Sequence, residues 1–127
     1  MTHTVHAILI VDDDDDIREL LAEFLEDEGY RVTTARNGLD ALGKLRAGSA
    51  HPCLILLDLM MPVMNGFQFL EAFRSDPALS PIPVAVVSAH GGLGAAERAA
   101  IAAPIFTKPL ALPALLEMVG RLCQDQR

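Results

Sequence analysis

The hydrophobic positions of the chain form two alternating patterns: short continuous apolar runs, and longer segments with an apolar residue at every third or fourth position. A short apolar run bounded by turn residues is typical of a buried strand, whereas the longer repeat predicts an amphipathic helix. The predicted strands are residues 7–11, 31–35, 54–58, 84–88 and 104–107. The helices predicted to follow them are residues 14–28, 37–48, 66–74, 95–103 and 112–122.

This alternation predicts an α/β fold in which a parallel sheet is covered by helices on both faces, as a three-layer sandwich with right-handed crossovers. The most continuous apolar runs, residues 7–11 and 54–58, are expected at the centre of a sheet with strand order 2-1-3-4-5. The more polar run 31–35 suits an edge. We expect one domain over residues 1–127, with its core at about 6–123 and no output domain after it.

Composition narrows the classes of protein that this chain can belong to. Half of its 127 residues are apolar (51%), which is ample for one core, but no apolar run approaches the roughly 18 residues of a membrane span. The start of the chain lacks the features of a signal peptide, so we expect a cytoplasmic protein. The net charge of −7 argues against nonspecific binding to nucleic acid or to anionic lipid.

The cysteines and histidines carry no recognisable metal-binding spacing. Cys53 and Cys123 are far apart in the sequence, which fits a reduced compartment, and we expect both to pack as small hydrophobic residues. His3, His6 and His51 are expected on the surface.

Polar residues stand where four of the predicted strands end. Asp12 and Asp13 follow the first strand, Asp58 ends the third, Ser88 ends the fourth and Lys108 follows the fifth. Parallel strands end at one edge of the sheet, so these side chains should converge where open α/β sheets bind ligands. Carboxylates on neighbouring strands ~4 Å apart would repel by about 4 kcal/mol at an effective dielectric constant of 20. Such a cluster predicts a cation, best Mg²⁺, with Mn²⁺ as a substitute.

A carboxylate beside a metal ion at a solvent-exposed edge can also attack phosphorus. The cation would neutralise the phosphoryl oxygens, Lys108 would add a positive charge and Ser88 a hydrogen bond. The pattern therefore predicts a site that takes a phosphoryl group onto Asp58.

Four motifs in order carry a family resemblance that covers nearly the whole chain. They are Ile8–Asp13, Leu56–Pro62 with Asn65-Gly66, Val87–Ala89, and Thr107–Pro109. With these motifs the chain resembles the receiver domains of two-component response regulators and is similar to the single-domain chemotaxis regulators. The resemblance implies the flavodoxin-like, doubly wound (βα)5 fold.

The resemblance also implies a role for each matching residue at the acidic edge. Asp58 would accept the phosphoryl group from a histidine kinase or a phosphotransfer protein. Asp13 and Asp58 would bind Mg²⁺ directly, Asp12 mainly through water, and Met60 through its backbone carbonyl. Phosphorylation would then shift an equilibrium between two states of a protein-binding surface.

Two further roles and three departures from the family pattern complete what the resemblance implies. The Ser88 hydroxyl would move toward the phosphoryl group, and Lys108 would pair with it. Ile105 stands where the family often has an aromatic switch residue, so an aromatic flip cannot occur there, and a short fourth helix is expected to alter the usual output face. Met60 and His90 occupy the two positions that tune phosphoryl loss, and neither positions water well, so we expect slow autodephosphorylation.

Two other functions compete with the phosphoacceptor. Asp12-x-Asp14 faintly resembles the motif of haloacid dehalogenase phosphatases, but Asp16 stands where that motif has Thr or Val. A receiver-like adaptor that works without phosphorylation is disfavoured by the complete residue set. We expect a signalling protein rather than an enzyme, monomeric, acting on an unidentified downstream protein. Asp14, Asp15 and Asp16 are expected to cap the first helix.

Overall fold

Strands and helices alternate along the chain, as the hydrophobic pattern predicts. The computed structural model describes residues 6–48, 51–61, 63–88, 93–107 and 111–124. The strands are β1 (Ala7–Val11), β2 (Arg31–Ala35), β3 (Leu54–Asp58), β4 (Val84–Ser88) and β5 (Ile105–Thr107). The helices are α1 (Asp15–Asp27), α2 (Gly38–Arg46), α3 (Gly66–Arg74), α4 (Ala95–Ile101) and α5 (Leu112–Gln124).

The five strands form one parallel sheet in the order β2-β1-β3-β4-β5. The predicted order is therefore confirmed, with β1 and β3 at the centre and the more polar β2 at an edge. Val11 of β1 is in register with Leu57 of β3, and Asp58 is in register with Val87 of β4. This register decides which strand-end side chains become neighbours.

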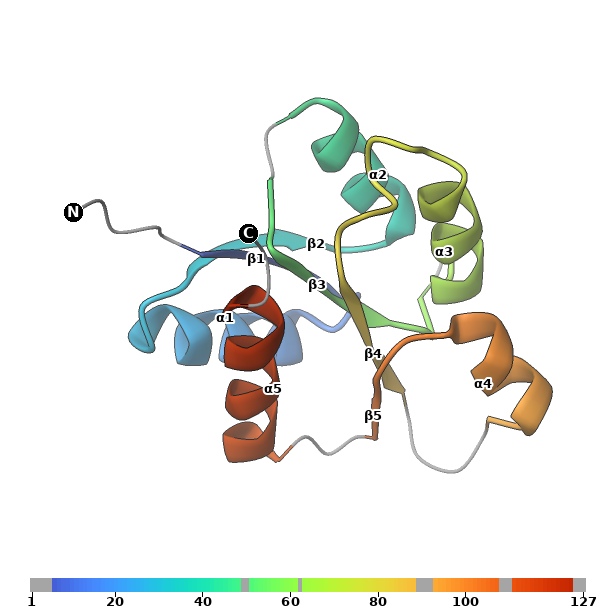
Figure 1. Ribbon diagram of the computed structural model, residues 1–127. Coiled ribbons are helices and arrows are strands. Elements are labelled where there is room, and N and C mark those ends of the chain that lie inside the picture. The colour runs from blue at the N-terminus through green and yellow to red at the C-terminus, as the bar shows by residue number, and fades with distance from the viewer. Residues whose placement is uncertain (1–5, 49–50, 62, 89–92, 108–110, 125–127) are drawn as a thin grey trace.

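Helices α1 and α5 cover one face of the sheet and α2, α3 and α4 the other, which makes three layers (Figure 1). An apolar cluster fills the space between the sheet and the helices on each face. Alternate strand residues point to opposite faces, so Leu9 and Ile55 pack under α2 and α3 while Ile8 and Leu56 pack against α1 and α5. Ile101 of α4 joins the first cluster. The fold class is thus the predicted three-layer α/β/α sandwich.

The helices begin at side-chain caps that the sequence displays. Asp14 accepts hydrogen bonds from the backbone N–H groups of Asp16 and Ile17, and Asn37 accepts one from Asp40. Asn65 and Gln68 form a capping box at the start of α3. Caps of this kind typically contribute ~1 kcal/mol each. They set the points at which the chain turns back from the carboxyl edge of the sheet.

Two details of the buried helix faces differ from the expected pattern. The apolar repeat of residues 14–28 begins with Ile17 at i and Leu20 at i+3, which predicts that Leu20 faces the sheet. In the structure Leu20 is 56% exposed, whereas Leu21 and Leu25 are buried. In the helix at residues 66–74 the expected apolar positions are Phe67, Leu70 and Phe73, but Phe67 is only half-buried. Phe69 is fully buried instead, and its ring stacks on Phe73 with the ring centroids 5.5 Å apart. The sheet contacts only part of each apolar stripe. A periodic pattern therefore predicts which side of a helix is buried, but not which residues at the margins of that side are covered.

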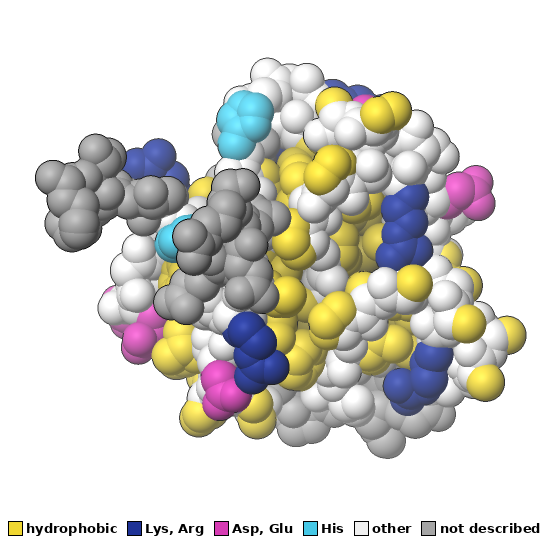
Figure 2. Space-filling model, viewed as in Figure 1, with side chains coloured by type: hydrophobic (Ala, Val, Ile, Leu, Met, Phe, Trp, Pro, Cys, Tyr) yellow, Lys and Arg dark blue, Asp and Glu magenta, His cyan; other side chains and the backbone are white. Residues whose placement is uncertain are grey.

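The segment around α4 is short, as predicted, and its end is held by α3. Helix α4 has seven residues, and Ala102, which caps its C-terminal end, has a left-handed backbone with φ 48°. Arg74 donates hydrogen bonds to the carbonyl of Ala100 (2.9 Å) and to that of Ile101. A pocket of about 350 Å³ lies beside these residues, between the α3–β4 loop and the α4–β5 turn. Figure 2 shows hydrophobic side chains gathered in the middle of this face.

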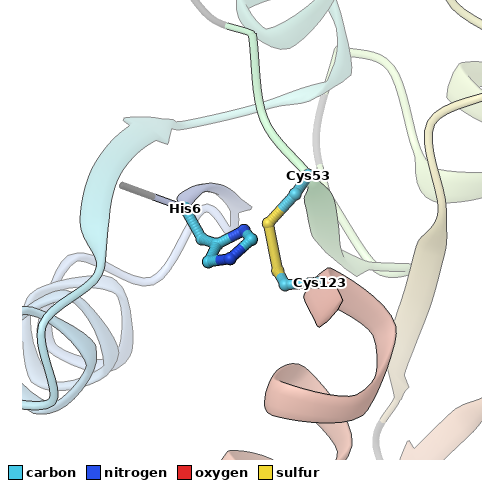
Figure 3. Close-up of side chains that lie close together, drawn as sticks. All are labelled: His6, Cys53 and Cys123. Atoms are coloured by element: carbon cyan, nitrogen blue, oxygen red, sulfur yellow. A yellow bond between two sulfur atoms is a disulfide. The ribbon is translucent and has the colours of Figure 1, made fainter. Parts of the chain in front are cut away.

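The prediction that the cysteines are reduced and unpaired is wrong. Cys53 and Cys123, 70 residues apart, form a disulfide with a Cα–Cα distance of 5.3 Å. The bond joins the start of β3 to the last turn of α5. Both cysteines are buried, as expected, but His6 also departs from prediction because it lies half-buried beside the disulfide (Figure 3).

Within the described parts of the chain, no helix combines the length and the apolar character that are needed to cross a bilayer.

Candidate functional site at the carboxyl edge of the sheet

Three aspartates meet at the ends of the two central strands. Asp12 follows β1 and Asp58 ends β3, and the register of these strands places the two residues side by side. One carboxylate oxygen from each of Asp12, Asp13 and Asp58 lies within 4.8 Å of the others. Asp12 and Asp58 are 3% and 4% exposed, whereas Asp13 faces solvent. The cluster is therefore open to solvent on the side of Asp13.

Backbone groups hold both buried carboxylates in place. The N–H of Asp14 donates a hydrogen bond to Oδ1 of Asp12 (2.9 Å), and the N–H of Met60 donates one to Oδ1 of Asp58 (3.3 Å). Each bond closes a turn of three residues at a strand end, which is a common arrangement for aspartate. The two side chains are thus oriented before any ligand is bound.

Arg18 supports the same edge, although an amphipathic helix is expected to place a charged residue at this position on its solvent-exposed side. Its Nη1 donates a hydrogen bond to the backbone carbonyl of Asp12 at 2.8 Å, and its Nη2 pairs with Asp15. The guanidinium side chain is only 17% exposed. The sequence held one signal for this contact. Arg18 lies one turn into the helix that follows the acidic end of the first strand.

The β3–α3 connection carries Met60 past the cluster. Gly66 donates its backbone N–H to the carbonyl of Leu59 (2.9 Å), which closes the connection onto the end of β3. The Met60 side chain is 70% exposed, and Val63 is 75% exposed with φ 68°. The loop thus presents apolar side chains to solvent beside Asp58.

Ser88 is the last residue of β4 and is 7% exposed. It lies one residue beyond Val87, the partner of Asp58, and pairs with Thr107 of β5. Lys108 follows Thr107 directly, but Lys108 and His90 lie outside the described residues. Their predicted roles therefore stay predictions.

The aspartate cluster has the composition of a site for a hard divalent cation. Two nearly buried carboxylates whose oxygens lie within 4.8 Å of each other need positive charge nearby. All the clustered donors are oxygens, which suit Mg²⁺, Mn²⁺ or Ca²⁺ better than softer metals. The acidic pocket formed by Asp12, Asp13 and Asp58 can therefore bind a metal ion.

The fold and this edge define a doubly wound α/β domain with an acidic pocket at the carboxyl ends of its central strands. The profile of the response regulator receiver domain family matches residues 8–120. The chain belongs to this family, which is a family of two-component signalling proteins.

Two relatives show how the similarity is distributed. The chain is 45% identical over 84 residues to the transcriptional regulatory protein CpxR homolog of Haemophilus influenzae, which covers 66% of this chain and 34% of that protein. It is 30% identical to the polar-differentiation response regulator DivK of Brucella ovis, covering 94% of this chain and 97% of DivK. The chain thus spans about a third of the first relative and nearly all of the second.

Solved structures show the same fold. The receiver domain of a signal transduction histidine kinase from Syntrophus aciditrophicus superposes with a TM-score of 0.85 at 29% identity, covering 97% of this chain and 93% of that one. The chemotaxis protein CheY4 of Vibrio cholerae gives 0.81 at 31% identity, covering 94% and 99%. The resemblance found in the sequence motifs is therefore confirmed.

Proposed function

We propose that this chain is a phosphoacceptor in which Asp58 takes a phosphoryl group from a phosphohistidine of a histidine kinase or a phosphotransfer protein. The carboxylate of Asp58 forms the new bond to phosphorus, and the histidine nitrogen leaves with the bonding electrons. The observation that carries the proposal is the pair of oriented, nearly buried carboxylates, Asp12 and Asp58, beside exposed Asp13.

The residues around Asp58 would bind the metal ion and contact the phosphoryl oxygens. Asp12, Asp13, Asp58 and the backbone carbonyl of Met60 would hold Mg²⁺, for which Mn²⁺ can substitute. When bound, the ion would neutralise the phosphoryl oxygens as they approach the carboxylates. The Ser88 hydroxyl donates a hydrogen bond to one phosphoryl oxygen, and Lys108 supplies a charge to another. The buried position of Ser88, one residue past the partner of Asp58, supports its part.

The signal would be read by another protein. We propose that phosphorylation shifts the equilibrium between two states of the surface around α4, β5 and α5, within a monomer located in the cytoplasm. Ile105 of β5 is half-buried against the α2–α3 side of the core, so the change proceeds without an aromatic ring at that position. Because α4 has only seven residues, this surface is expected to differ from the usual output face of the family.

The proposal is tested by intact mass after incubation with acetyl phosphate. We expect a gain of one phosphoryl group in the presence of Mg²⁺ and no gain when EDTA replaces it, because the carboxylate cluster would otherwise repel an anionic donor. Mn²⁺ should restore the gain. Folded protein that gains no mass with either ion would instead support an adaptor that acts without phosphorylation.

The phosphorylated form is expected to decay slowly, because Met60, whose side chain is exposed, carries no amide or carboxylate that would position an attacking water molecule well. Met60→Asn adds an amide at that position and should speed the decay. One added hydrogen bond of about 1 kcal/mol corresponds to roughly a fivefold faster rate. The measurement is the loss of the phosphorylated mass with time after donor removal.

Val63→Asn is the matched control, since it adds the same amide to the same loop at an exposed residue. Its φ of 68° is one that asparagine adopts readily. Decay of the unmodified protein within seconds, or equal decay in the two variants, would contradict the role given to Met60.

A further inference from the structure

Three side chains from distant parts of the chain meet at the amino edge of the sheet, opposite the carboxylate cluster. His6 precedes β1, Cys53 precedes β3, and Cys123 lies in the last turn of α5. A ring nitrogen of His6 lies within 4.8 Å of both sulfur atoms. Figure 3 shows the imidazole ring beside the disulfide.

The backbone on the sheet side of this group is held by strand pairing. Cys53 donates its N–H to the carbonyl of Ala7 (2.7 Å), and Arg31 donates its N–H to the carbonyl of His6 (3.0 Å). Cys123, by contrast, belongs to a helix end, where few intrahelical bonds remain to be broken. The disulfide therefore joins the end of a helix to a segment that is held by strand pairing.

We propose that Cys53 and Cys123 form a reversible thiol–disulfide site, assisted by His6, that locks the end of α5 to the sheet. The proposal is independent of phosphorylation at Asp58. Both cysteines belong to the apolar cluster of α1 and α5. Reduced cysteines pack as small hydrophobic residues, so the cluster can persist when the bond is open.

The solvent exposure of the two cysteines indicates which of them reacts first. Cys53 is 8% exposed and Cys123 is fully buried. The Cys53 thiolate attacks a low-molecular-weight disulfide, forms a mixed disulfide and releases one small thiolate. The Cys123 thiolate then attacks the Cys53 sulfur, which closes the protein disulfide and releases the second small thiolate. The protein thus loses two electrons and two protons, and the small disulfide is reduced to two thiols.

His6 has the chemistry to speed this sequence. Thiolates, not thiols, are the attacking species, and an adjacent imidazole increases the thiolate fraction by accepting the proton. His6 is half-buried and beside both sulfurs, so it can serve either cysteine. In this role His6 accepts the thiol proton and forms no covalent bond to either sulfur.

The test starts from the full chain reduced with dithiothreitol and then equilibrated in mixtures of reduced and oxidised glutathione. Free thiols are alkylated and counted by intact mass. We expect two alkylated thiols under reducing conditions, none under oxidising conditions, and the same midpoint from both directions. The thermal midpoint should fall by roughly 10 °C on reduction, because the bond closes a long loop.

Single variants separate the two thiols. Cys123→Ala, which retains Cys53, should form a mixed disulfide with glutathione about tenfold faster than Cys53→Ala, which retains the buried Cys123. His6→Gln should slow closure in the otherwise unchanged chain about tenfold and leave the midpoint ratio of glutathione unchanged. A purely structural role for His6 would move the midpoint or the thermal stability rather than the closure rate alone.

Several results would overturn the proposal. They are failure of the folded, reduced protein to close the bond, loss of the native circular dichroism on reduction, and retention of one Zn²⁺ per reduced chain that protects both thiols. The last would show a metal site instead. Acetyl phosphate labelling is measured in both redox states, so failure at the cysteines is distinguished from failure at Asp58.

Discussion

Asp58→Asn protein is expected to gain no phosphoryl group from acetyl phosphate at any Mg²⁺ concentration. Asparagine has nearly the shape of aspartate, and its side-chain oxygen can still accept the hydrogen bond from Met60 N–H (3.3 Å in the native chain). It has no carboxylate to attack phosphorus, so the loss should be complete rather than partial. Intact mass and circular dichroism together separate lost chemistry from lost folding.

The matched control is Asp16→Asn, which removes the same charge from an exposed first-turn residue of α1. It should be labelled as fully as the native chain. Labelling that survives in Asp58→Asn would place the acceptor elsewhere and refute the assignment of Asp58.

The same variant should be more stable than the native chain when no divalent cation is present. The oxygens of Asp12 and Asp58 lie within 4.8 Å, a separation at which two charges repel by about 3 kcal/mol at an effective dielectric constant of 20. Removing one charge should therefore raise the free energy of unfolding in EDTA, on the order of 1 kcal/mol after solvent screening. Saturating Mg²⁺ should reduce or reverse this gain, since the ion stabilises only the intact cluster.

Gly66→Ala is expected to destabilise the fold by about 3 kcal/mol. A Cβ at Gly66 would lie 2.6 Å from Cδ2 and 2.7 Å from Cα of Leu59, and 3.1 Å from the carbonyl oxygen of Asp58. The Cα of Leu59 cannot move away easily, because Leu59 donates its N–H to Val87 and accepts one from Gly66. Relief of the clash would displace the chain beside Asp58, so Mg²⁺-dependent labelling should also fall.

Gly43→Ala provides the matched control within the same fold. Gly43 lies on the exposed side of α2, and a Cβ there would meet no atom within 4 Å. Alanine in a helix interior is favoured over glycine by roughly 0.5–1 kcal/mol, so this variant should be slightly more stable than the native chain. Urea unfolding measures both variants. Equal midpoints for Gly66→Ala and the native chain would show that the β3–α3 connection tolerates displacement.

The helices and strands could be predicted from the sequence because each has a local signal in its own residues. The continuous apolar runs at β1 and β3 showed their central positions, and Asp14, Asn37 and Asn65 showed where helices begin. The burial of single helix residues was not readable in this way. Leu20 belongs to the apolar repeat of α1 and is nevertheless 56% exposed, whereas Phe69 of α3 is fully buried. The way each helix packs on the sheet decides which of its apolar side chains are covered.

The sequence by itself determined the parallel sheet, its strand order and the convergence of Asp12, Asp13 and Asp58 on one edge. These follow from alternation and from the rule that parallel strands end together. Only the tertiary structure decided the contact of Arg18 with the Asp12 carbonyl and the meeting of His6 with Cys53 and Cys123. The physical reason is that hydrophobic periodicity depends only on residues close together in the sequence. A disulfide between cysteines 70 residues apart depends on how α5 packs near the start of β3.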